Sequence, residues 1–241
     1  DTIDFADNNL DVSGRSEVVQ DKTDVEDENV IFTYGDTQNQ VEMINADDLH
    51  VADFTGEGIT IAVMDSGFPN VNTMGAFQRL RDNGDLLDGY DFVTRNSDVY
   101  ANTASSHGTR VLSDMAGFVQ DQFVGTAPDA SYYLFLTEDA TSETPVEESY
   151  WVEAAERADS LGVDMINTSL GYRVFDNSNY NYTPADMNGQ VAFISKGASI
   201  AAEKGILVVV SAGNAGATAW QTVGAPADSP DVLSIGGVDA D

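Results

Sequence analysis

The chain has 241 residues, which is enough for one sizeable domain with a buried core. Its 41 acidic and 10 basic residues give a formal net charge of −31, and this field repels nucleic-acid phosphates and anionic lipids, so we expect neither nucleic acid nor a membrane as a partner. It has no cysteine, which excludes disulfides and thiolate metal sites, and its longest apolar run, 206–210, is far too short to span a bilayer.

The acidic surface suggests a saline or marine environment. A dense layer of carboxylates keeps a protein soluble in strong salt, where its self-repulsion is screened. We therefore interpret the charge as an adaptation to salt, and we expect the stability of the folded chain to depend on ionic strength.

The chain begins with a polar, acidic stretch and then becomes patterned. Residues 1–32 show little periodicity and are interpreted as an acidic linker or the remnant of a pro-segment, so that 33–241 form the folded domain. Residues 58–65, "GITIAVMD", are a β-branched apolar run that stops at Asp-Ser-Gly, which predicts a buried strand ending in a turn. Residues 107–119 then favour a helix.

Strands and helices alternate through the second half of the chain. We expect helices at 146–162 and 191–205, each closed by a glycine. One face of the first helix is apolar: Trp151, Ala154, Ala155, Ala158 and Leu161. The expected strands are 130–137, 163–170, 206–213 and 232–239. This alternation predicts an α/β fold of three layers, with a mostly parallel central sheet and helices on both faces.

Three polar residues fall where such a sheet gathers its functional groups. Asp65 ends the first strong strand, His107 opens a helix, and Asn214 follows the strand at 206–213. Each also has a plain structural explanation: an aspartate in a turn, a histidine at a helix start, and an asparagine in a left-handed turn. Histidine is, however, the side chain best suited to move protons near neutral pH.

Four stretches together carry a family resemblance. "GITIAVMDSG", "SSHGTRVLSDMAG", "VDMINTSLGY" and "VVVSAGNAG", in this order, resemble the subtilisin-like serine proteases, the subtilases. The similarity runs from about residue 38 to the end, and the acidic composition resembles that of secreted subtilases of marine bacteria. The resemblance implies the subtilisin-like fold, an extracellular location, and a serine endopeptidase that acts on proteins and peptides.

The resemblance also implies roles for individual residues. His107 would be the general base toward a serine hydroxyl, Asp65 would hold its imidazole, and Asn214 would donate its amide to the oxyanion. Substrate would lie extended along two backbone segments, because in the family one pairs with the peptide as an added strand and the other forms a wall of the main side-chain pocket. Here these segments are Ser169, Leu170 and Gly171, and Ser211, Ala212 and Gly213.

The family's nucleophile turn, Gly-Thr-Ser, is missing. Gly-Thr occurs only at 108–109 and 125–126, where Arg and Ala follow it. By the resemblance the chain covers about two-thirds of a catalytic domain and is inactive alone, and we expect the serine on a second polypeptide that follows Asp241. The alternative is a natural, non-catalytic module that binds extended peptides without cutting them.

Other chemistries receive less support. Two distant histidines without an H-E-x-x-H motif do not favour a zinc enzyme, and His50 is interpreted as structural. A nucleotide-binding domain is not favoured, because no glycine-rich phosphate motif follows the first strand. The resemblance implies no cofactor for the chemistry and calcium only as a structural ion. The family's calcium loop is replaced by 117–125, and the acidic segment 136–149 is explained as well by a solvated rim, so no metal ligands are assigned.

Overall fold

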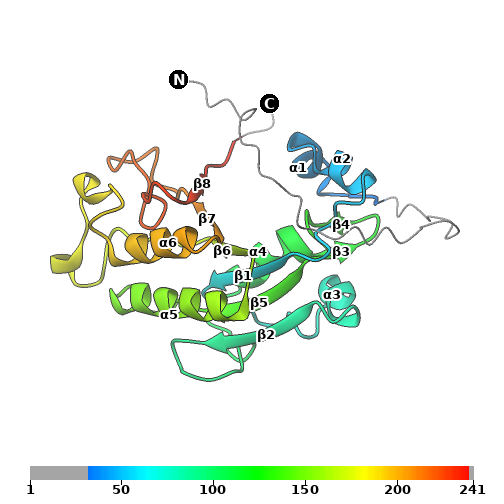
Figure 1. Cartoon of the computed structure of the whole chain (residues 1–241), viewed down its shortest axis with the longest axis horizontal. Coiled ribbons are helices and arrows are strands. Elements are labelled where there is room, and N and C mark those ends of the chain that lie inside the picture. The colour runs from blue at the N-terminus through cyan, green and yellow to red at the C-terminus, as the bar shows by residue number, and fades with distance from the viewer. Residues whose placement is uncertain (1–31, 239–241) are drawn as a thin grey trace, which may run out of the picture. The chain divides into compact units, whose positions relative to one another are not determined.

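The computed structural model describes residues 32–238, so the interpretation of 1–32 as a linker or pro-segment lies almost wholly outside the described residues. Their core is a six-stranded sheet in the order β2-β5-β1-β6-β7-β8, with every neighbouring pair parallel (Figure 1). The strands are β1 Thr60–Asp65, β2 Leu86–Asp91, β5 Ser131–Leu136, β6 Met165–Thr168, β7 Leu207–Ser211 and β8 Leu233–Ile235. The α-helices are α1 Gln38–Met43, α2 Ala46–Val51, α3 Gln78–Asp82, α4 His107–Ala116, α5 Val146–Leu161 and α6 Phe193–Glu203.

The alternation of side chains along β1 sorts the core into two layers. Ala62 and Met64 belong to the apolar cluster that includes α5 and α6, whereas Ile61 and Val63 belong to the cluster that includes α4 and α3. Successive side chains of a strand point to opposite faces, so β1 is covered by helices on both sides. The predicted three-layer α/β fold with a mostly parallel sheet is confirmed.

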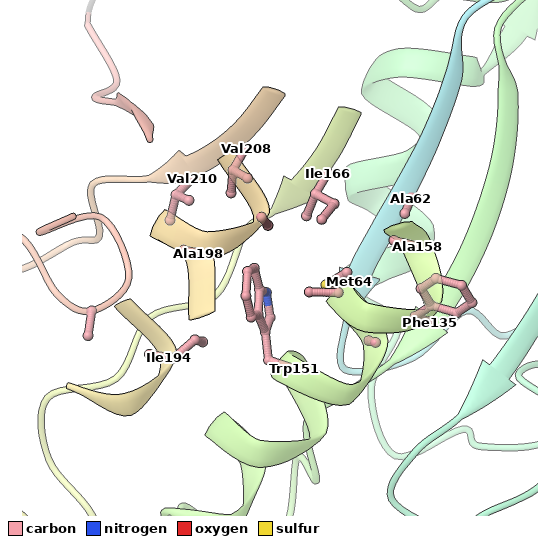
Figure 2. Packing of buried hydrophobic residues seen from close by; sticks show 14 of the residues in the cluster. Ala62, Met64, Phe135, Trp151, Ala158, Ile166, Ile194, Ala198, Val208 and Val210 are labelled. Carbon is pink, nitrogen blue, oxygen red and sulfur yellow. The ribbon is translucent and has the colours of Figure 1, made fainter. Parts of the chain in front are cut away.

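The larger cluster is built around Trp151. Its side chain is fully buried between α5 and α6 and the sheet, close to Met64 and Ile166 (Figure 2). Its indole N–H donates to the Thr168 hydroxyl at 2.9 Å, which satisfies the one polar atom of the ring. The helix α5 ends at Gly162, whose φ of 73° is in the left-handed region, as the sequence predicts.

The helix that starts at His107 is shorter than the predicted 107–119. It ends before Gly117, which is extended, and Phe118–Val119 forms strand β3 of a hairpin with β4, Phe123–Val124. Gly117 accommodates this close hairpin because a Cβ there would meet the Ser113 carbonyl oxygen at 2.6 Å. The amide of Gly125 closes the turn by donating to the Gly117 carbonyl at 2.8 Å.

Strand β2 was not predicted from the sequence. It lies at the edge of the sheet, and several of its side chains are exposed or only half-buried, including Leu86, Leu87 and Asp88. An edge strand of this kind lacks the continuous apolar run that marks the buried strands.

The architecture brings the carboxyl ends of β1, β5, β6 and β7 to one edge of the sheet, since their neighbours pair in parallel. In sheets of this kind, functional side chains gather at that edge. Among residues 32–238, no helix is long and apolar enough to cross a membrane.

Candidate active site

Asp65 is the last residue of β1 and is completely buried. Its Oδ1 accepts a hydrogen bond from the Ser66 backbone N–H at 2.7 Å. A buried carboxylate needs such donors to offset its desolvation, and the sharp Asp-Ser-Gly turn supplies one from the next residue.

His107 is the first residue of α4, and its ring meets Asp65. The ring nitrogen Nδ1 lies 2.8 Å from Oδ1 and 2.9 Å from Oδ2 of that carboxylate. The other face of the site is open, because the His107 side chain is 51% exposed. The hydrogen bond to Asp65 raises the pKa of His107, and partial burial opposes this shift.

Gly108 is the reason that α4 can approach β1 so closely. A Cβ at this position would meet the Gly67 carbonyl oxygen and the Phe68 ring at 2.7 Å, and the Cβ of Asp65 at 2.9 Å. The helix start also donates its Thr109 N–H to the same Gly67 carbonyl at 3.2 Å. Because residue 108 has no side chain, the start of α4 can lie close enough to β1 for the imidazole to reach the carboxylate.

A pocket of about 350 Å³ lies beside this pair. It includes the segment Ser169–Gly171, which follows β6, and two glutamates, Glu138 and Glu143, from the loop after β5. Its full lining is Ser66, Ser105, His107, Glu138, Ala140, Glu143, Ser169, Leu170 and Gly171. The structure thus brings the Asp65–His107 pair and one of the two predicted substrate segments to a single concave site.

None of the three serines of this pocket forms a hydrogen bond with the His107 ring. Ser66 Oγ donates to Ser105 Oγ at 2.8 Å, and Ser105 Oγ in turn accepts from the His107 backbone N–H at 3.1 Å. Ser169 Oγ lies 3.5 Å from the Asn167 side-chain oxygen. Among residues 32–238, no side chain forms a hydrogen bond with Nε2 of His107.

The second predicted segment lies at the end of the neighbouring strand. Ser211 is the last residue of β7, the Ala212 N–H donates to the Ile235 carbonyl at 2.8 Å, and Gly213 has a φ of 85°. Asn214 follows it and is exposed. These residues are on the same edge of the sheet as the pocket but do not line it.

His50 is held in the interior, away from the site. Its ring stacks on Tyr34, and its two nitrogens lie 2.8 Å from the Tyr34 hydroxyl and 3.0 Å from the Thr126 carbonyl oxygen. Both ring nitrogens therefore have protein partners. In the described part of the chain, no three His, Asp or Glu side chains gather closely enough to hold a metal ion, so we derive no role for calcium.

Sequence reasoning missed the two glutamates of the pocket. From the sequence, a solvated rim explains segment 136–149 as well as a metal site does, yet Glu138 is partly buried and lies just after the end of β5. The position of Glu138 just after a predicted strand could have indicated it. Strand β5 pairs with β1 along its whole length, so the residues that follow β5 lie beside Asp65.

Comparison with known proteins gives a consistent result. The model of the subtilase family matches residues 56–241. Subtilisin E of Bacillus subtilis (strain 168) is 29% identical over 223 residues, which cover 90% of this chain and 50% of that protein. The minor extracellular protease Vpr of the same organism is 29% identical over 200 residues, covering 80% of this chain and 22% of that protein.

Among solved structures, the crystal structure of MycP1 with the N-terminal propeptide removed is similar. It has a TM-score of 0.55 and 22% identity, covering 84% of this chain and 63% of that one. At this identity the likeness shows the fold. The chain spans about half the length of the subtilisins it matches.

Proposed function

The chain belongs to the subtilase family of serine peptidases, and we propose on that basis that it supplies Asp65 and His107 to the catalytic triad of a secreted endopeptidase. The observation that carries this proposal is the short contact between a fully buried carboxylate and Nδ1 of a half-exposed imidazole. Such a pair leaves Nε2 available for a serine hydroxyl, which is the arrangement of a Ser-His-Asp triad.

Each member of the pair has a distinct task. Nε2 of His107 takes the proton of the attacking hydroxyl and returns it to the leaving amine. Asp65 accepts the Nδ1–H bond, which fixes the tautomer and stabilises the imidazolium that forms. Because its carboxylate is buried and accepts the Ser66 N–H bond, its orientation toward the ring is restrained.

Substrate contacts extend the proposal to the neighbouring strand ends. The segment Ser169–Gly171 lines the pocket and offers backbone groups to an extended peptide. Ser211–Gly213, at the end of the neighbouring strand and outside this pocket, would form the other wall of the main side-chain pocket, as the family resemblance implies. Asn214 donates its side-chain amide to the oxyanion of the tetrahedral intermediate. Its exposure and its position three residues after the end of β7 are compatible with this task.

We propose that the nucleophile comes from polypeptide beyond residue 241. Two observations support this: no serine of the pocket forms a hydrogen bond with the His107 ring, and the β7–β8 end of the sheet presents apolar side chains to solvent. Leu207, Leu233 and Ile235 are 46%, 50% and 49% exposed, and burying them under a further segment is favourable at about 25 cal/mol per Å². The same segment would then bring the serine to His107.

Fluorophosphonate labelling of the full-length protein tests this function. We expect one serine outside residues 1–241 to be labelled, and the label to be lost in His107→Ala, since an unactivated hydroxyl reacts slowly. Peptide mapping by mass spectrometry identifies the labelled residue. A label that survives in His107→Ala contradicts the assignment of the base.

The alternative is a peptide-binding module without a nucleophile. The observation that favours it is the lack of any described side chain bonded to Nε2 of His107. In that case the full-length protein binds extended peptides, takes no label and releases no fragments.

A further inference from the structure

The pocket beside His107 contains two carboxylates that the fold does not use. Glu138 and Glu143 both line it and both are half-buried. The Glu143 backbone is tied to Asp176 by hydrogen bonds of 2.9 and 3.1 Å, so the loop is held in place. Yet neither carboxylate forms a hydrogen bond or an ion pair with a described residue.

The next two glutamates show what a structural carboxylate looks like here. Glu147 accepts hydrogen bonds from the Asp139 and Thr144 backbone N–H groups at 3.0 and 2.9 Å. Glu148 accepts from the Tyr182 hydroxyl at 2.7 Å and from the Ile194 N–H at 2.9 Å. Both have partners that offset their burial, whereas the two glutamates of the pocket lack them.

The electrostatic setting of the pair is unfavourable without a cation. Burial, together with Glu147 and Asp65, raises the pKa of Glu138 to about 7. Burial, together with Glu138, Glu147 and Asp176, raises the pKa of Glu143 to about 7. Desolvated carboxylates with acidic neighbours resist ionisation, and an incoming positive charge relieves both effects.

A separate polar group points to the same cluster. The Tyr172 side chain is 1% exposed and its hydroxyl has no hydrogen-bond partner among the described residues. Burial raises the pKa of this phenol well above its usual value, and Glu138, Glu147, Glu143 and Glu148 contribute in the same direction. A buried hydroxyl without a partner is costly, and the acidic surroundings that affect this phenol are those that a cation in the pocket would offset.

We propose that this pocket recognises a basic side chain of the substrate, which enters between Glu138 and Glu143 while the peptide backbone lies along Ser169–Gly171. Apart from His107, these two glutamates are the only ionisable groups in its lining, and about 350 Å³ accommodates an arginine or lysine side chain. A guanidinium offers five N–H donors in a planar fork, which suits two separate carboxylates. An inorganic cation is less well served, because no three potential ligands in the described chain gather closely enough to hold one.

The proposal rests on the proposed function for the placement of the peptide along Ser169–Gly171. Its test distinguishes failure of the arginine pocket from failure of the peptidase function. Fluorescent peptides carry arginine, lysine or neutral citrulline at each position in turn, and their binding to the full-length protein is measured by anisotropy. Citrulline has nearly the shape of arginine but no charge. We expect arginine to bind at least about tenfold more tightly than citrulline at one position, as close charge pairs in desolvated sites do.

The variant Glu138→Gln with Glu143→Gln should bring the arginine-to-citrulline ratio to within about twofold of one, as the charge pairing is lost. The matched control is Glu156→Gln with Glu203→Gln, which removes the same charge from exposed positions on α5 and α6 and should leave the ratio unchanged. The ratio should also rise between pH 6 and 8, and more in the wild type than in the double variant, because the pair ionises through about pH 7, whereas His107, the other titrating group of the lining, is present in both proteins. If the double variant fails to fold, Glu143→Gln alone gives the same comparison.

Several results would overturn the inference. An arginine-to-citrulline ratio near one at every peptide position contradicts the proposal. So does a ratio that the control variant lowers as much as the Glu138/Glu143 variant, because the overall negative charge of the protein then explains the preference. Calcium binding that requires Glu138 and Glu143, with no arginine preference, makes the pocket a metal site instead. Binding with arginine preference but without cleavage contradicts the proposed peptidase function and supports the arginine pocket. Cleavage without arginine preference supports the peptidase function and contradicts the arginine pocket.

Discussion

The hydrogen bond between Asp65 and His107 sets the pH at which the imidazole loses its charge, and with it the pH at which the proposed general base would become available. It favours the protonated imidazole and so raises the His107 pKa above its ordinary value of 6.5. Activity that needs neutral His107 therefore rises with pH through that raised pKa. In Asp65→Asn the bond to a carboxylate is lost, and we expect the acidic limb of the kcat/KM profile to move to lower pH while kcat falls about 10⁴-fold, as in other triads.

Nuclear magnetic resonance checks the same shift without catalysis. The chain has two histidines, so the ring signals of His107 are assigned by comparison with His107→Asn, and His50 provides an internal reference. An imidazole that titrates at the same pH in wild type and Asp65→Asn would contradict the proposed coupling.

Asn214 should matter for rate and little for folding. It is exposed and forms no hydrogen bond with another residue of the described chain, so Asn214→Ala should leave the free energy of unfolding unchanged. In subtilisin, loss of the corresponding donor lowers kcat by about 10²–10³, and we expect a similar fall here with KM nearly constant. The control Asn72→Ala, another exposed position, should change neither quantity. Activity within about threefold of wild type would remove Asn214 from the mechanism.

Among the elements, the contact between α4 and β1 holds His107 beside Asp65. In Gly108→Ala the new methyl group collides with Gly67, Phe68 and Asp65, and the helix start must shift. We expect a loss of about 1–3 kcal/mol in the free energy of unfolding and a fall of about 10²-fold in kcat, because displacement of about 1 Å is enough to disturb proton transfer.

Gly75→Ala is the matched control for this change. Nothing lies within 4 Å of a Cβ at that position, which starts a short 3₁₀-helix, Gly75–Phe77. Its free energy of unfolding should stay within about 0.5 kcal/mol of wild type. Denaturant titration and peptide kinetics on the full-length protein give both readouts, and equal effects at the two positions would show that the close packing at 108 is unimportant.

The elements that the sequence could predict are those whose local signals agree. Strand β1 is a continuous apolar run, and α5 combines an apolar face containing Trp151 with the αL glycine at 162. Strand β2 and the glutamates after β5 could not be predicted in the same way, because their roles depend on pairing between distant segments. The Asp65–His107 pair was found through the family motif, and its contact distance required the fold.

For the molecule as a whole, charge is the dominant feature. A net charge of −31 destabilises the compact state through self-repulsion, and few cations are available to offset it. We expect the thermal midpoint to rise between about 0.01 M and 1 M NaCl, over which the Debye length falls from about 30 Å to about 3 Å. Scanning calorimetry in NaCl and KCl, with sucrose as an uncharged control, separates screening from solute exclusion. A midpoint independent of salt would contradict the interpretation as salt adaptation.

The strand order has a consequence for how the protein folds during its synthesis. Strand β1 is flanked by β5 and β6, and Ser131, the first residue of β5, comes 66 positions after Asp65, since 131 − 65 = 66. When His107 has just been synthesised, both residues of the Asp65–His107 contact exist, but neither neighbouring strand of β1 does. Such distant pairings form slowly. The contact between Asp65 and His107 therefore gains its full support from the sheet only after residue 168, the end of β6, has been translated.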